Sequence, residues 1–139
     1  DKILEKSKDN PVFYVQYCYA RINSLYKTLN LDLDLPIADN DEDFNLNYYE
    51  NMIIRKIFDW PKIIDTAAKK YEPHRIPFYL YDLATLFHSY WSKGNEDEEY
   101  KFINNGQIKN INTLIIIKAL AIVIESGMSI LGVSLPKKM

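Results

Sequence analysis

Apolar residues recur every three or four positions between Asn10 and Leu29, which predicts an amphipathic helix over this stretch. Asn10 before Pro11 is a strong helix start. Asparagine caps a free backbone N–H, and proline at the first helical position has no N–H to leave unpaired. The expected apolar stripe consists of Val12, Val15, Tyr19, Ile22, Tyr26 and Leu29.

The same periodicity predicts four more helices, at 48–60, 62–71, about 72–91 and about 112–126. The last of these is apolar nearly all round and should be the most buried, with Gly127 in or just after its last turn. The polar stretch 92–110 is expected to be a loop. Because no strand pattern competes, the predicted class is all-α, a bundle of about five helices. Its inward positions should include Met52, Ile53, Ile57, Trp60, Ile63, Ile64, Ala67, Ala68, Ile76, Leu80, Leu83, Phe87 and Tyr90.

The composition favours one folded domain without a global basic signature. The chain has 139 residues, of which 47% are hydrophobic and 14% aromatic, so disorder is excluded as the main state. The formal net charge is −2. Nucleic-acid binding would therefore have to come from a local patch.

Cysteine usage and the apolar runs bear on the cellular compartment. The single cysteine, Cys18, excludes an internal disulfide and fits a small buried residue in a reducing cytosol, so we expect a cytoplasmic protein. The longest apolar run, 111–124, contains Lys118 and falls short of the roughly 20 residues needed to span a bilayer. We interpret it as a core helix and expect no membrane partner.

An acidic stretch resembles a calcium-binding loop but lacks its essential glycine. Asp39, Asp41, Asp43 and Glu50 occupy ligand positions of the template, whereas Phe44 stands where glycine must make the sharp turn. A solvated acidic linker is the favoured interpretation.

No catalytic arrangement is visible in the sequence. His74 and His88 would lie about 21 Å apart along one helix, at about 1.5 Å per residue, which is too far for a shared metal. We expect no catalytic residue, no metal site and no cofactor in this domain.

The remaining candidate is a binding surface of aromatic and basic residues. Rings beside guanidinium and ammonium groups suit single-stranded RNA, whose bases stack on them. Composition alone favours the plainer interpretation, in which the rings pack the bundle and the lysines solubilise the tail. The candidates are Tyr14, Tyr17, Arg21, Tyr90, Trp91, Lys137, Lys138 and Met139.

Three stretches in register resemble bacterial arginyl-tRNA synthetases. They are NPVFYVQYCYARI from residue 10, YEPHRIPFYLYDLATLFHSYW from residue 71, and KALAIVIESGMSILGVSLPKKM at the end of the chain. Together they cover the chain from about Ser7 to Met139.

The resemblance implies the C-terminal, helical anticodon-binding domain of that family at 10–139, with 1–9 as the stub of the junction to a catalytic domain. It also implies a parent enzyme that couples arginine to its tRNA with ATP and Mg2+, while this part alone is inactive. The implied partners are tRNA isoacceptors for arginine and the catalytic domain, and not DNA.

The resemblance also implies a pocket for one base of the anticodon. Every arginine anticodon has a central C, so a single cytosine pocket would serve all isoacceptors. Arg21 would supply hydrogen-bond donors, Tyr17 and Trp91 would stack on the base, and the C-terminal main chain would accept from its amino group. The residues expected to bind tRNA are Tyr14, Tyr17, Arg21, Trp91, Lys138 and Met139.

The sequence departs from the family pattern at three places. Cys18 and Tyr19 replace Ala-His, Thr113 stands where arginine is common, and the segment 93–110 continues differently. The alternative function is a helical protein-interaction or scaffold domain whose exposed aromatic residues meet a partner protein.

Overall fold

A computed structural model describes residues 10–36 and 45–138. Within these ranges the chain forms the five predicted helices, and the all-α class is confirmed. A short 3-10 helix, η1, and a small hairpin complete the fold. The elements are α1 (Pro11–Thr28), α2 (Tyr48–Phe58), α3 (Trp60–Lys69), α4 (Arg75–Glu96), η1 (Glu98–Tyr100), β1 (Ile103–Asn104), β2 (Gln107–Ile108) and α5 (Ile111–Leu131).

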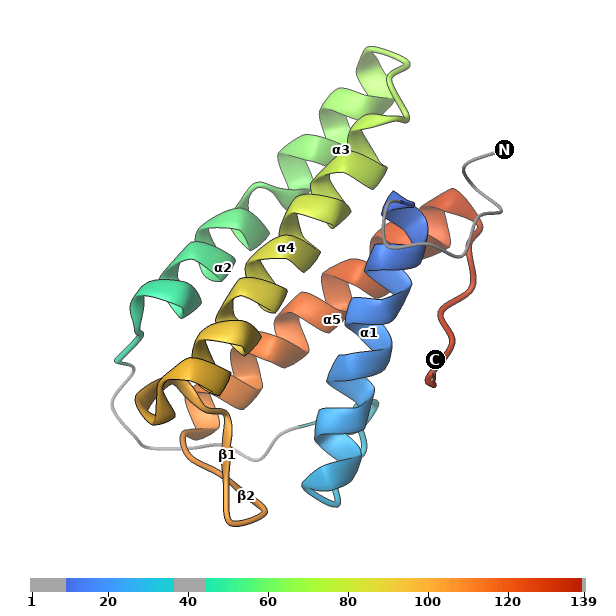
Figure 1. Cartoon of the computed structure of the whole chain (residues 1–139). Coiled ribbons are helices and arrows are strands. Elements are labelled where there is room, and N and C mark those ends of the chain that lie inside the picture. The colour runs from blue at the N-terminus through green and yellow to red at the C-terminus, as the bar shows by residue number, and fades with distance from the viewer. Residues whose placement is uncertain (1–9, 37–44, 139) are drawn as a thin grey trace.

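Helix α4 is the centre of the bundle. It packs against α1 on one side and against α2 and α3 on the other, and α5 crosses behind it (Figure 1). The inward positions predicted on α4 are all buried, as are most of those on α1. The pattern is wrong at Met52 and Ala68, which are exposed, because α2 and α3 each bury only a narrow face.

The start of α1 follows from its first two residues. The Asn10 side chain accepts a hydrogen bond from the Val12 backbone N–H at 3.0 Å, and Pro11 occupies the first helical position. The apolar stripe then buries Val15, Ile22 and Tyr26 against the core.

The expected loop at 92–110 is partly wrong. Helix α4 continues for five residues past Trp91, to Glu96, and the rest of the segment carries η1 and the antiparallel β1–β2 hairpin. Asn105 and Gly106 form its turn with φ of 53° and 76°. An Asn-Gly pair is the strongest short hairpin signal, so the sequence did contain the evidence for this turn.

Helix α5 is longer than predicted because Gly127 lies inside it. A Cβ at this position would lie 2.7 Å from the Leu80 side chain, so glycine allows α5 to cross close to α4. The helix ends instead at Gly132, which adopts the left-handed conformation at φ 68°.

Helix α5 is long and apolar enough to cross a membrane by length and composition alone, as core helices of soluble proteins also are. Half of the apolar window is buried inside the fold.

Glu50 is buried at the junction of α2, α4 and α5, where it is held by several hydrogen bonds. Its carboxyl group accepts from the Tyr90 hydroxyl at 3.1 Å, from the Thr113 hydroxyl and from the Asn47 backbone N–H at 3.1 Å. The Asn47 side chain in turn accepts from the Glu50 N–H, which completes a capping box. The other acids of the calcium-loop pattern lie outside the described residues, and Glu50 serves this network.

Candidate nucleic-acid interface

Arg21 lies between two aromatic rings at the surface of α1. Its guanidinium carbon is 4.9 Å from the centre of the Tyr17 ring and 5.1 Å from that of Trp91. The guanidinium also donates a hydrogen bond to the Tyr17 hydroxyl. Tyr17 and Arg21 are neighbours because they are four residues apart on one helix, whereas Trp91 arrives from α4. The fold therefore brings together three of the predicted site residues.

A groove of about 490 Å3 runs beside this cluster. One wall is α1, and the other is formed by Trp91 and by Ile103 of the hairpin. Sequence reasoning missed Ile103, because it treated the hairpin as a loop. The lining residues are Tyr17, Ala20, Arg21, Ser24, Leu25, Thr28, Trp91 and Ile103.

Tyr14 lies outside this groove. Its ring is 4.8 Å from the rings of both Tyr81 and His88, and it borders a separate hollow of about 370 Å3 on the α4 side. Partial burial raises the pKa of Tyr14. The two predicted tyrosines of α1 thus face different hollows.

His88 packs against Tyr17 on the inner side of the cluster formed by Tyr17, Arg21 and Trp91. Its imidazole stacks on the Tyr17 ring at 5.6 Å and meets the Phe87 ring at 5.5 Å. Burial, reinforced by the positive charge of Arg21, lowers the pKa of His88 to about 4. At physiological pH the imidazole is therefore neutral, and Tyr17 stacks on an uncharged ring.

The depressed pKa of His88 predicts acid sensitivity. The His88 imidazole takes up a proton near pH 6.5 in the unfolded chain and only near pH 4 in the folded chain. The contribution of neutral His88 to the free energy of unfolding is therefore complete above pH 6.5 and is lost as the pH falls towards 4. We expect the free energy of unfolding to fall by about 1–2 kcal/mol more between pH 7 and pH 5 in the wild type than in His88→Gln. Urea titrations at the two pH values measure this difference. His74→Gln, at an exposed histidine, is the matched control and should behave like the wild type.

Two side chains of α1 hydrogen-bond to the backbone of the C-terminal segment. The Gln16 side chain donates to the Ser134 carbonyl at 2.8 Å, and the Asn23 side chain donates to the Lys137 carbonyl at 3.0 Å. Figure 1 shows the segment running beside α1. Lys138 is exposed and does not line the groove. Met139 lies outside the described residues.

The prediction that Tyr90 belongs to the binding surface is wrong. Tyr90 is buried, its ring packs on Phe102 at 4.4 Å, and its hydroxyl donates to Glu50. Burial and the neighbouring Glu50 raise the pKa of Tyr90 to about 12, although hydrogen bonds from neighbouring side chains oppose this shift.

The departures from the family pattern have structural roles here. Cys18 is fully buried, and burial raises the pKa of its thiol, so it behaves as a small apolar residue. The Tyr19 hydroxyl donates to Glu125 at 2.6 Å, which ties α1 to α5. Thr113 donates to Glu50 from inside the bundle.

In the part of the chain that the structure describes, no three or more histidine, cysteine, aspartate or glutamate side chains lie together as they would to bind a metal ion.

Comparisons with known proteins agree with the resemblance seen in the sequence. Residues 15–139 match the model of the DALR anticodon binding domain. The chain is 47% identical over 138 residues to an arginine–tRNA ligase of Pelagibacter ubique, covering 99% of this chain and 24% of that protein. It is 42% identical over 144 residues to the arginine–tRNA ligase of Rhizobium meliloti, covering 99% of this chain and 25% of that protein.

A solved structure supports the fold. The arginyl-tRNA synthetase of Thermus thermophilus superimposes with a TM-score of 0.71 at 22% identity, over 96% of this chain and 22% of that one. The chain thus spans about a quarter of the length of the proteins it matches. On the match over 15–139, this chain belongs to the DALR anticodon-binding domain family.

Proposed function

We propose that this domain recognises the anticodon loop of arginine tRNAs as part of an arginine–tRNA ligase. The observation that carries the proposal is the guanidinium of Arg21, placed between two aromatic rings at the edge of a groove. Aromatic rings provide stacking surfaces for unpaired bases, and the guanidinium provides directed donors for their edges. The relatives that share this domain are named arginine–tRNA ligases.

Cytosine is the base that we propose for this groove. A guanidinium carries five N–H donors, and the bond to Tyr17 uses one of them. Two others would donate to the O2 and N3 acceptors of cytosine. Because every arginine anticodon has C at its centre, one such pocket reads all isoacceptors without needing to read their outer bases.

The remaining steps of aminoacylation belong to the rest of the proposed ligase. We assign the activation of arginine with ATP and Mg2+, and its transfer to the tRNA, to the roughly three quarters of the relatives' length that this chain does not cover. We assign the protein to the cytoplasm, where tRNA charging takes place.

The central base provides the direct test. We expect the chain to bind an arginine anticodon stem-loop with central C about tenfold more tightly than the same stem-loop with central U. Uracil has a carbonyl in place of the amino group and an N–H at N3, so the Arg21 donor to N3 and the acceptor for the amino group lose their partners. Fluorescence anisotropy with labelled stem-loops measures both affinities. Equal affinities for the two RNAs would contradict the proposal.

Salt dependence separates RNA recognition from the alternative, a protein-interaction domain. Binding to the stem-loop should weaken steadily as salt rises from 50 to about 200 mM, since Lys and Arg contacts release counterions from the phosphates. An apolar protein interface would not show this loss. A salt-independent affinity would therefore favour the alternative.

A further inference from the structure

A polar hollow of about 320 Å3 lies where the first turns of α2 and α5 meet the segment around η1. None of its described lining residues also lines the groove, so the hollow has no part in the proposed recognition of cytosine. Its floor is buried, and its rim carries charged and amide side chains. The lining residues are Asn45, Leu46, Asn47, Glu50, Tyr90, Glu99, Lys101, Lys109, Asn110 and Thr113.

The carboxylate of Glu50, on the floor of the hollow, is buried without a positive partner. Its hydrogen bonds come from one backbone N–H and two hydroxyl groups. No lysine or arginine among the described residues forms an ion pair with it. An unpaired buried charge is costly, and proteins normally provide a partner for it. A carboxylate offers about four acceptor positions, so one position remains for a donor in the hollow.

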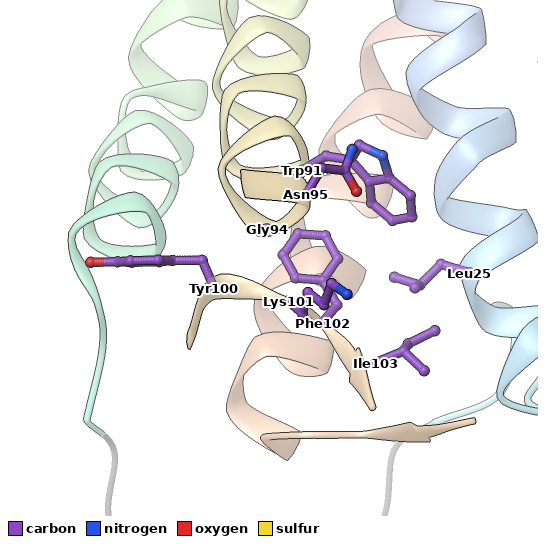
Figure 2. A pocket seen from close by; sticks show the side chains of 8 residues that line it. All are labelled: Leu25, Trp91, Gly94, Asn95, Tyr100, Lys101, Phe102 and Ile103. Atoms are coloured by element: carbon purple, nitrogen blue, oxygen red, sulfur yellow. The ribbon is translucent and has the colours of Figure 1, made fainter. Parts of the chain in front are cut away.

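The rim of the hollow is positioned by the chain that follows α4. Gly94 allows this chain to pass against the last turn of α4 (Figure 2), because a Cβ there would lie 2.9 Å from the Tyr100 carbonyl oxygen and 3.2 Å from the Lys101 Cα. The Lys109 ammonium donates to the Glu98 carbonyl at 2.6 Å, which leaves two of its three donors for a ligand. Two lysines of the rim are therefore held beside the hollow by contacts of their own segment.

The described lining carries two negative and two positive side chains. Glu50 lies at the buried floor, whereas Glu99, Lys101 and Lys109 are exposed at the rim. A complementary ligand has a cation at one end, and a carboxylate and a second cation at the other. We propose that the hollow binds a free basic amino acid of the lysine type. The volume lies at the small end of the roughly 300–1,000 Å3 of pockets for small molecules, which agrees with a ligand of this size.

An ammonium group suits the floor better than a guanidinium group. With one acceptor position left on Glu50, the two parallel bonds of a guanidinium–carboxylate pair cannot form. An ammonium group has three rotatable donors, which can be divided between Glu50 and the hydroxyl oxygen of Thr113. At the rim, the two lysines bind the carboxylate of the ligand and Glu99 binds its α-ammonium group. Each charged group of the ligand thus has a partner of opposite sign.

Three ligands test the two ends of the hollow by isothermal titration calorimetry. L-Lysine carries both groups, L-norleucine lacks the side-chain ammonium group, and cadaverine lacks the carboxylate. We expect L-lysine to bind with a dissociation constant in the millimolar range. Because a hydrogen bond between charged groups is lost in each case, L-norleucine and cadaverine should both bind at least about tenfold more weakly.

Variants assign the binding to this hollow. In Glu50→Gln, which lacks the negative charge, the preference for L-lysine over L-norleucine should fall to about twofold or less. In Lys101→Ala/Lys109→Ala the preference for L-lysine over cadaverine should fall in the same way. Asp65→Asn and Lys62→Ala change exposed residues of α3, and as matched controls they should retain both preferences.

The outcomes decide the inference independently of the anticodon groove, which shares no described lining residue with the hollow. Equal affinities for L-lysine and L-norleucine in the wild type, or no binding of L-lysine, would overturn it. Preferences that survive unchanged in the variants would overturn it as well. Circular dichroism at the titration temperature shows that each variant is folded. If Glu50→Gln is not folded, the double lysine variant, whose changed side chains are exposed, decides alone.

Discussion

Replacing Arg21 by alanine is expected to weaken binding to the arginine anticodon stem-loop by roughly two orders of magnitude. A hydrogen bond that involves a charged group contributes about 1.5–3 kcal/mol, and each 1.4 kcal/mol corresponds to a tenfold change in affinity. The change also removes the cation that Tyr17 and Trp91 enclose. Anisotropy titrations at fixed salt measure the loss.

Two further variants separate charge from geometry at this position. Arg21→Lys keeps the positive charge but lacks the planar fork of donors, so we expect it to recover only part of the affinity. Arg55→Ala removes an exposed arginine of α2 away from the groove and should change binding less than twofold. If Arg21→Ala and Arg55→Ala bound equally well, the groove could not be the recognition site.

The long helices could be predicted because their signals are local. The stripe on α1 and the inward positions of α4 follow from the period of the helix alone. The predicted positions on α4 are all buried, and so are most of those on α1. Gly127 shows where local reasoning fails. Glycine often ends a helix, but here its role is decided by Leu80 on another helix, which no pattern along α5 reveals.

The candidate site was predictable only in part for a similar reason. Tyr17 and Arg21 are neighbours by helical spacing, whereas Trp91 could be placed beside them only through the family resemblance. Ile103 was missed because β1 and β2 have two residues each, too few for a strand pattern. The hairpin takes its place through the close approach of residues 100–101 to Gly94, which is a tertiary contact.

The largest expected effect on stability is that of Glu50→Ala. Glu50 is 2% exposed, and its carboxyl group accepts hydrogen bonds from Asn47 at the cap of α2, from Tyr90 of α4 and from Thr113 of α5. The change removes half of the capping box, at about 1 kcal/mol, and leaves the Tyr90 and Thr113 hydroxyls without their acceptor, at about 1–3 kcal/mol. We expect the free energy of unfolding to fall by about 2–4 kcal/mol. Urea denaturation with linear extrapolation measures it.

Conservative and exposed replacements test whether the network is the cause. Glu50→Gln keeps the shape and one acceptor oxygen, and the Thr113 hydroxyl can turn to accept from the new amide, so the loss should be clearly smaller than for alanine. Glu99→Ala removes an exposed carboxyl group and should cost less than about 0.5 kcal/mol. Equal losses in Glu50→Ala and Glu99→Ala would contradict the role of the network. Glu50 contacts Tyr90 and does not line the groove, so folded Glu50→Ala protein should retain its RNA affinity. This result would separate the residues that stabilise the bundle from those that bind the anticodon.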